Sequence, residues 1–204
     1  MTKLENRLAR AASPADPQAP ARAAEHTRVR ALDEGLVDVA YIEADSPVGP
    51  LVLAATDRGL VRLAYADGGA DPVLEDIARR VSPRMLESPA RLDRARRELD
   101  EYFAGGRRAF ELPIDWQLVH GFGRQVLEAT VRIPYGDAAT YKSVAASAGS
   151  PRAMRAAGNA LGANPMPVVI PCHRVLRTGG GMGGYTGGLE RKRFLLELEG
   201  HIHS

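Results

Sequence analysis

Residues 165–175 read PMPVVIPCHRV, and this stretch indicates most about the fold and the chemistry of the chain. The apolar run 168–170 predicts a buried strand or extended segment, which Pro171 closes. Cys172 follows directly and is the only cysteine in the sequence. The role of this single thiol is therefore the main question that the sequence raises.

The side chains next to Cys172 distinguish it from a buried free cysteine, which is usually an inert small hydrophobic residue. Cationic neighbours such as His173 and Arg174 can lower the pKa of a thiol below roughly 8.5 and supply thiolate. Adjacent residues of an extended chain point to opposite sides, so we expect His173 to reach the sulfur through a bridging water. A histidine in that role needs an orienting carboxylate, and candidates lie in the predicted helix Leu189–Leu198 and at Glu199 just after it.

A single cysteine among 204 residues excludes an intrachain disulfide and any zinc site built on a cysteine pair. No stretch has the roughly 18 uninterrupted apolar residues of a transmembrane helix, and residues 1–26 lack the apolar run of a signal peptide. We therefore expect a cytoplasmic protein without membrane contact, metal site or cofactor.

Charge and composition divide the chain into three parts. Residues 1–35 are rich in Ala and Pro, carry 6 basic and 5 acidic side chains, and predict a disordered extension. Residues 36–119 carry 11 basic and 15 acidic side chains, and residues 120–204 carry 10 and 5. The net charges of +1, −4 and +5 suggest that an anionic partner meets the last part, although solvated helix faces would explain the excess equally well.

The middle part predicts a small α+β scaffold domain without a cluster of reactive residues. Alternating apolar residues between turn signals indicate strands of an antiparallel meander, and apolar residues at helical spacing indicate helices. The expected strands are 37–41, 51–55, 60–65 and 110–114, and the expected helices are 72–82 and 91–103.

Residues 140–162 predict a helix-turn-helix. A short helix over Thr140–Ala148 is stopped by Gly149, and Ser150-Pro151 supplies a preferred N-cap and first residue for a second helix. Two short helices joined by about three residues that include a glycine are typical of this motif.

The outer face of the second helix carries Arg155, Arg152 and Asn159 among small residues that include Gly158. A backbone flanked by small residues can approach DNA closely, which fits shallow contact in the minor groove. A solvated helix of a small bundle explains the same pattern.

The glycine-rich segment 179–188 contains no Gly-Lys-Ser/Thr sequence and is therefore not a phosphate-binding P-loop. It is either a flexible linker or a loop that wraps a ligand with backbone amides and the ring of Tyr185.

Taken together, these segments resemble the O6-alkylguanine-DNA alkyltransferases, also called methylated-DNA–protein-cysteine methyltransferases. The matching segments cover most of residues 120–200: Ile133-Pro134-Tyr135-Gly136, Thr140-Tyr141, the Arg155 helix, Asn164-Pro165, 171–175, 183–188 and 195–200. A weaker likeness covers 46–51 and 102–105. The resemblance implies a ribonuclease-H-like α/β N-terminal domain packed on a mainly helical domain with the helix-turn-helix.

The resemblance also implies a function and its catalytic residues. An alkyl group of O6-alkylguanine, and of O4-alkylthymine, would move irreversibly to Cys172, once per molecule, after the base is flipped out of the duplex. His173 would act as the base through water, Glu199 would orient it, and Tyr141 would donate to the departing guanine.

The partner implied is double-stranded DNA that carries O6-alkylguanine, bound in the minor groove by a monomer capable of cooperative assembly. Arg155 would fill the space left by the flipped base. The remaining roles are a base pocket and its support: Tyr185, Thr186, Pro167 and the Val175 carbonyl line the pocket, and Asn164 and Arg174 brace it.

Some positions depart from the family pattern. Residues 119–124, on a supporting helix, differ from the usual sequence, Thr186 replaces Ser, and Met154 replaces a small residue beside Arg155. Three other functions stay open: a lesion-binding module without catalysis, a transcription regulator or thiol sensor, and a Cys–His peptidase. The intact Cys172 counts against a lesion-binding module without catalysis. The lack of a second thiol counts against a thiol sensor, and the lack of oxyanion donors counts against a peptidase.

Overall fold

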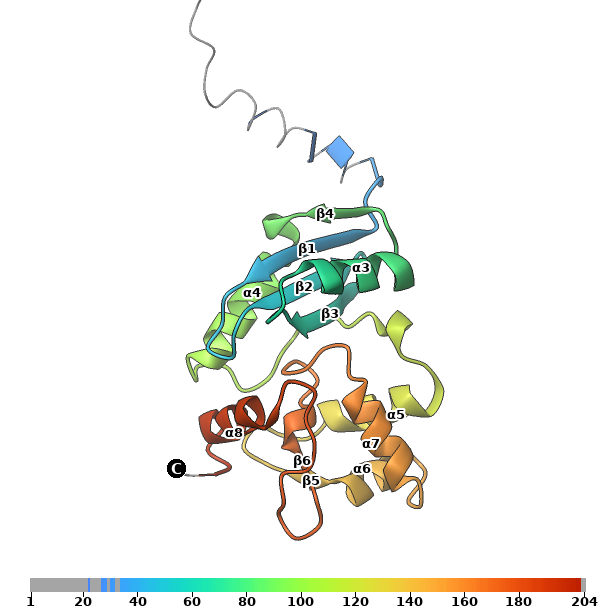
Figure 1. The fold of residues 1–204 in the computed structure, drawn as a ribbon, viewed down its shortest axis with the longest axis vertical. Coiled ribbons are helices and arrows are strands. Elements are labelled where there is room, and N and C mark those ends of the chain that lie inside the picture. The colour runs from blue at the N-terminus through green and yellow to red at the C-terminus, as the bar shows by residue number, and fades with distance from the viewer. Residues whose placement is uncertain (1–21, 23–26, 29, 32–33, 203–204) are drawn as a thin grey trace, which may run out of the picture. The chain divides into compact units, whose positions relative to one another are not determined.

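The computed structural model of the chain describes residues 22, 27–28, 30–31 and 34–202. The chain divides into two compact units, Met1–Val37 and Asp38–Ser204. The predicted extension 1–35 lies mostly outside the described residues, and the sheet and helices labelled in Figure 1 all belong to the second unit. This unit has the predicted α+β class. None of the helices in the described ranges has the length and apolar character needed to cross a membrane.

A four-stranded sheet in the order β3-β2-β1-β4 forms the N-terminal lobe, residues 38–119. The strands are β1 (Val39–Ala44), β2 (Leu51–Thr56), β3 (Gly59–Tyr65) and β4 (Met85–Glu87). The first three form the expected antiparallel meander, whereas β4 pairs parallel with β1. The sequence did not predict β4 because its 3 residues are too few to show an alternation. The lobe boundary at 119/120 stays a prediction.

Helices α3 (Asp71–Arg80) and α4 (Pro89–Phe103) cover opposite faces of this sheet, close to the predicted ranges (Figure 1). Alternate strand residues explain the arrangement. Leu53 packs in one apolar cluster with Leu99 of α4, and its neighbour Val52 packs in another with Ile77 of α3. The sheet therefore has a core on each side.

The strand predicted over 110–114 is wrong. Only Ile114 forms an isolated bridge, to Leu60. Pro113 accepts a hydrogen bond from Leu60 N at 2.8 Å but has no N–H to return one. A ladder cannot continue through it, and the segment runs on to the short 3-10 helix η1 (Trp116–Leu118).

The C-terminal lobe, residues 120–202, is mainly helical, as predicted. Its elements in chain order are α5 (Gly121–Val131), β5 (Ala139–Thr140), α6 (Tyr141–Ser147), α7 (Met154–Gly162), η2 (Cys172–Arg174), β6 (Val175–Leu176) and α8 (Leu189–Leu198). β5 and β6 pair in parallel. This short pairing places Thr140, which directly precedes α6, beside Leu176, which lies two residues after η2, and so brings the two most informative sequence segments together.

Helices α6 and α7 form the predicted helix-turn-helix, but α7 begins at Met154 and not at Pro151. Ser150 is engaged in the turn and does not cap α7. Its amide donates to Ala145 O at 2.9 Å and its carbonyl accepts from Ala153 N at 2.9 Å. The turn therefore spans residues 148–153, and Arg152 precedes the helix on which the sequence placed it.

The apolar run 168–170 is buried, as predicted, but it does not form a strand. Ile170 N donates to Met166 O at 2.8 Å, and Val168 lies in the left-handed region with a φ of 73°. Cys172 to Arg174 then form η2. The prolines at 165, 167 and 171 lack N–H groups, so this stretch cannot form a strand ladder, and its apolar run is buried in turns instead.

One apolar core extends through both lobes. Leu53 and Leu63 of the sheet belong to the same cluster of buried side chains as Val126 of α5 and Ile170. The backbone adds a link, because Leu63 N donates to Pro165 O at 3.0 Å. The sheet thus supports the segment that carries Cys172.

Candidate functional site

Cys172 begins η2 and is 5% exposed. Its Sγ accepts a hydrogen bond from Asn164 Nδ2 at 3.1 Å. The same amide nitrogen donates to Ile170 O at 2.9 Å, and Asn164 Oδ1 accepts from Met166 N at 3.0 Å. Asn164 therefore braces the turn before the cysteine and contacts the sulfur directly.

His173 is fully buried, and its Nε2 lies 2.9 Å from Glu199 Oε1. Burial lowers the pKa of His173, and this outweighs the raising effect of Glu199. A carboxylate can only accept, so the neutral imidazole carries its hydrogen on Nε2 and leaves Nδ1 as the acceptor. Nδ1 is buried without a hydrogen-bond partner in the described part of the chain. His173 thus has a free acceptor nitrogen and directly follows Cys172 in sequence, and a base that acts through water requires such an acceptor.

Glu199 follows α8 and collects donors from several elements. Arg174 donates from Nε and Nη2 to its two oxygens, each at 2.8 Å, and Tyr102 of α4 donates its hydroxyl at 2.6 Å. Burial would raise the pKa of Glu199, but the hydrogen bonds from His173 and Arg174 lower it to about 2. The carboxylate is therefore charged and fixed in position.

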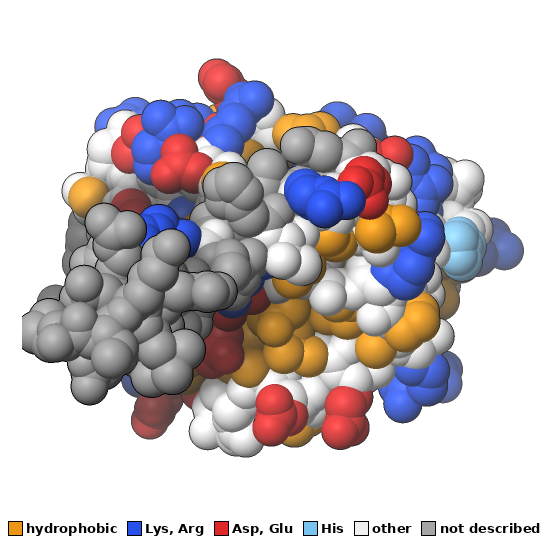
Figure 2. Space-filling model, turned by 90° about the horizontal axis from the view of Figure 1, so that it is seen from above, with side chains coloured by type: hydrophobic (Ala, Val, Ile, Leu, Met, Phe, Trp, Pro, Cys, Tyr) orange, Lys and Arg blue, Asp and Glu red, His pale blue; other side chains and the backbone are white. Residues whose placement is uncertain are grey.

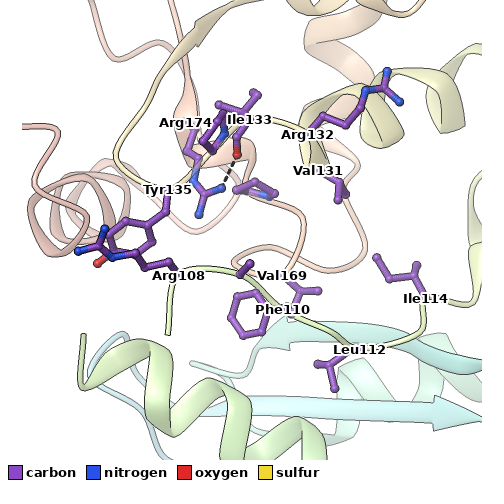
Figure 3. A pocket seen from close by; sticks show the side chains of 13 residues that line it. Arg108, Phe110, Leu112, Ile114, Val131, Arg132, Ile133, Tyr135, Val169 and Arg174 are labelled. Carbon is purple, nitrogen blue, oxygen red and sulfur yellow. Dashed lines mark hydrogen bonds between the residues drawn. The ribbon is translucent and has the colours of Figure 1, made fainter. Parts of the chain in front are cut away.

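Arg174 is buried and also donates to Ile133 O at 2.6 Å (Figure 3). Its side chain borders a cavity of about 450 Å³ between the 108–114 segment and the 131–135 turn. Tyr135 lies in the same wall with Arg108 stacked 5.7 Å from its ring centre. Cys172 does not line this cavity.

The expected lowering of the thiol pKa is wrong. Burial raises the pKa of Cys172 to about 11, against the opposing effects of the Asn164 hydrogen bond and of the charge on Lys192. The guanidinium of Arg174 is bound to Glu199 and Ile133 instead of the sulfur, and His173 is neutral. The resting side chain is thus a thiol, and thiolate forms only when a base removes the proton.

A second cavity, of about 330 Å³, opens onto the sulfur. It is lined by Tyr141, Gly158, Leu161, Gly162, Cys172, Gly184, Tyr185 and Thr186. Tyr141 directly follows β5, Cys172 lies three residues before β6, and both side chains line this cavity. Tyr141 donates to Gly184 O at 3.5 Å, and Thr186 donates to Gly162 O at 2.8 Å.

Two of the predicted pocket residues lie behind this cavity. Pro167 and Val175 are buried and do not line it. The Val175 carbonyl accepts a hydrogen bond from Lys192 Nζ at 2.7 Å. Gly158, expected in the DNA contact surface, lines the cavity on the side of α7.

The predicted DNA-contact residues Arg152, Arg155 and Asn159 are exposed on the turn and on α7. Within the described ranges, neither arginine forms an ion pair. Several arginines of the N-terminal lobe are paired instead, as Arg79 is with Asp76 and Arg84 is with Asp38. Figure 2 shows Lys and Arg side chains beside Asp and Glu on the face seen from above Figure 1.

Sequence reasoning missed two polar residues of the site. Tyr102 was assigned to an apolar helix stripe, and nothing in the sequence pairs it with a glutamate 97 residues away. Lys192 is 0% exposed, donates to the carbonyls of Val175, Met182 and Gly184, and has its pKa lowered by burial to about 8. Lys192 lies three residues before Leu195 and seven before Glu199. This spacing places it on the same helical face as these buried residues, and it was the sequence signal for the burial of Lys192.

No cluster of three or more His, Cys, Asp or Glu side chains that could hold a metal ion occurs among the described residues. The chemistry available is therefore that of a buried thiol, a neutral imidazole held by a carboxylate, and the phenols of Tyr141 and Tyr185 on a shared cavity.

Two domain models of one family match the chain in sequence order. Residues 39–116 match the ribonuclease-like domain of 6-O-methylguanine DNA methyltransferase, and residues 121–201 match its DNA-binding domain. A methylated-DNA–protein-cysteine methyltransferase of Methanosarcina barkeri is 38% identical over 159 residues, 78% of this chain and 96% of the relative. A constitutive relative of the same name from Bacillus subtilis is 36% identical over 78% of this chain and 94% of its own.

Solved structures give the same result. The O6-methylguanine methyltransferase of Mycobacterium tuberculosis superimposes with a TM-score of 0.68 at 36% identity, covering 81% of this chain and 96% of its own. A structure of OGT from that organism in complex with DNA gives 0.66 at 36% identity, covering 78% and 92%. Sequence and fold agree over both lobes, and the chain belongs to the 6-O-methylguanine DNA methyltransferase family.

Proposed function

We propose that this protein repairs double-stranded DNA by moving the alkyl group of O6-alkylguanine to Cys172, irreversibly and once per molecule. The observation that carries the proposal is the sulfur of Cys172 on the wall of a cavity, beside a neutral His173 whose other nitrogen is held by Glu199. The names of the relatives from M. barkeri and B. subtilis support the same reaction.

The chemistry follows from the protonation states. His173 Nδ1 takes the thiol proton through a water, and Glu199 stabilises the imidazolium that forms. The thiolate attacks the alkyl carbon, a carbon–sulfur bond forms, and the carbon–O6 bond breaks with its electron pair passing to the guanine. Tyr141 donates a proton to the departing base and regains one from the His173 imidazolium through water, so that overall the thiol proton replaces the alkyl group on guanine.

The DNA partner enters through helix α7. The target atom lies inside the duplex, so the base must rotate out of the stack into the cavity before the thiolate can reach it. Arg155 would occupy the vacated space, Arg152 and Asn159 would contact the backbone, and Gly158 would let the helix approach the minor groove closely. The same displacement would act on O4-alkylthymine, and the protein would act as a cytoplasmic monomer.

The test is the intact mass of the protein after incubation with duplex DNA that contains one O6-methylguanine. We expect a gain equal to one methyl group replacing hydrogen, mapped by peptide sequencing to Cys172. Cys172→Ala should bind the same DNA without gaining mass. Unmodified Cys172 after prolonged incubation, or transfer by the Cys172→Ala variant, would refute the proposal.

A further inference from the structure

Besides Tyr102, which donates to Glu199, the N-terminal lobe brings the side chain of Tyr65 to the surroundings of the thiol. Tyr185 lines the cavity of Cys172, and its ring lies 6.5 Å from that of His173, edge to face. The Tyr185 hydroxyl is hydrogen-bonded, at 2.8 Å, to the hydroxyl of Tyr65, 120 residues earlier in the chain. Tyr65 is the last residue of β3, a strand of the sheet.

Tyr65 is itself held between the two lobes. The Arg191 guanidinium of α8 stacks on its ring, 4.2 Å from the centre. Arg191 also forms a two-pronged ion pair with Asp67 just after β3, and donates to Val48 O at 2.6 Å and to Gly187 O at 3.1 Å. One arginine therefore ties the loop that carries Tyr185 to the sheet.

The packing at Gly187 shows how closely the loop and Tyr65 meet. A Cβ at this position would lie 2.3 Å from Tyr65 Cε2 and 2.9 Å from Tyr185 Cε1. Only glycine lets the backbone pass at this distance. The two tyrosines are consequently fixed by contact from both sides.

Both phenols are neutral at physiological pH, because burial raises the pKa of Tyr65 to about 12 and that of Tyr185 well above its ordinary value. One of the two hydroxyls donates to the other, and this hydrogen bond fixes the direction of the Tyr185 phenol. Loss of the Tyr65 hydroxyl would leave Tyr185 free to turn within its loop.

We propose that Tyr65 is a positioning residue for alkyl transfer: through its hydrogen bond to Tyr185, the sheet of the N-terminal lobe fixes the wall of the cavity onto which Cys172 opens. The proposal rests on the proposed function. It assigns a part in the reaction to the lobe that the sequence treated as a scaffold.

The test is single-turnover transfer from O6-methylguanine duplex DNA by Tyr65→Phe, Tyr185→Phe and the double variant. Tyr65→Phe keeps the ring beneath Arg191 and removes only the hydroxyl. The rate at saturating DNA should fall about threefold to tenfold, the worth of one hydrogen bond, while the half-saturating DNA concentration stays within about twofold. Tyr41→Phe, the same change on β1 with no side-chain hydrogen bond in the described chain, should transfer at the wild-type rate.

The double variant separates positioning from general packing. If Tyr65 acts through Tyr185, the double variant is no slower than Tyr185→Phe alone, because the shared bond is already lost. A Tyr65→Phe rate equal to wild type, or a double-variant slowdown equal to the product of the two single effects, would overturn the proposal. Wild-type protein that gains no methyl group would instead refute the proposed function itself.

A second variant covers the case in which Tyr65→Phe does not fold. Asp67→Asn weakens the ion pair that holds Arg191 over Tyr65 and lies on the surface, where substitutions are usually tolerated. We expect a slower transfer rate at unchanged melting temperature. If Tyr65→Phe does not fold and the folded Asp67→Asn variant transfers at the wild-type rate, Tyr65 has a purely structural role. This result would contradict the positioning role.

Discussion

The charged groups behind Cys172 and those on helix α7 are arranged in opposite ways. Behind the thiol, Glu199 and Arg174 are buried. Glu199 is hydrogen-bonded to Arg174, to His173 and to Tyr102. On α7 and its preceding turn, Arg155 and Arg152 are exposed and form no ion pair in the described part of the chain. One set has its partners inside the protein, and the other is open to a partner from outside.

This difference separates two functions in energetic terms. Removing one member of a buried ion pair leaves an uncompensated charge and destabilises the fold. Removing an exposed, unpaired arginine alters little in the free protein and affects only what it binds. Substitutions in the buried cluster should therefore lower stability, whereas substitutions of the exposed arginines should lower only DNA binding.

The largest effect is expected for Glu199→Gln, which leaves Arg174 buried without its carboxylate. The free energy of unfolding should fall by about 3–5 kcal/mol, and methyl transfer should slow at least about 100-fold because His173 loses its orienting charge. Urea unfolding and single-turnover kinetics measure the two quantities. Glu197→Gln is the control, because Glu197 lies in the last turn of α8 and its side chain makes no hydrogen bond in the described chain. Similar behaviour of the two variants would contradict the comparison.

The second prediction concerns pH and the same buried cluster. His173 has its pKa lowered below 6.5 in the folded protein, so the unfolded chain binds the proton first and stability falls as the pH drops below 6.5. The slope should approach about 1.4 kcal/mol per pH unit. Glu199, with a pKa of about 2 against an ordinary 4.5, adds a further loss as the pH falls from 4.5 toward 2.

Urea unfolding measured between pH 7 and pH 5 tests the histidine part of this prediction. His173→Gln should remove the decline over this range while keeping the loss at lower pH. A wild-type stability that is flat from pH 7 to pH 5 would show that His173 is not held neutral by burial.

The third prediction concerns the exposed side. Arg155→Ala should weaken binding to lesion DNA about tenfold, because no side chain would then occupy the space that the flipped base vacates. Its free energy of unfolding should stay within about 0.5 kcal/mol of wild type. Fluorescence anisotropy in a Cys172→Ala background measures binding without transfer. Arg193→Ala, an exposed α8 arginine, is the matched control, and equal losses would mean that binding depends on net charge alone.

The smallest effect is expected in the N-terminal lobe. Arg79 is exposed and paired with Asp76 on α3, so Arg79→Ala should change stability by about 0–0.5 kcal/mol and leave DNA affinity unchanged. The same two measurements apply. Weaker DNA binding by this variant would mean that the DNA-contact surface includes α3 as well as α7.

Local patterns predicted those parts of the molecule in which neighbours in sequence decide the structure. The meander over β1, β2 and β3 and the helix α4 follow from periodicity over six or more residues. β4, β5 and β6 have only two or three residues and exist through pairing with distant strands, so no local pattern reveals them.

The residues of the site also differ in this way: those near Cys172 in its motif were predicted, and those from distant elements were not. The motif around Cys172 indicated His173 and Glu199, and the structure places these side chains 2.9 Å apart. The low thiol pKa was inferred from adjacency in sequence, whereas the direction of Arg174 and the depth of burial decide the electrostatics. Tyr102, Lys192 and Tyr65 reach the site from elements whose sequences read as packing or solvated faces.

The apolar core that runs from the sheet through to α5 and Ile170 also has a thermodynamic consequence. Elements that share one core lose their packing together, so the two lobes should melt in a single cooperative transition. A separately expressed C-terminal lobe would expose the side chains that Leu53 and Leu63 cover, and would tend to aggregate. We therefore expect that Cys172 and helix α7 do not form an independent folding unit without the sheet.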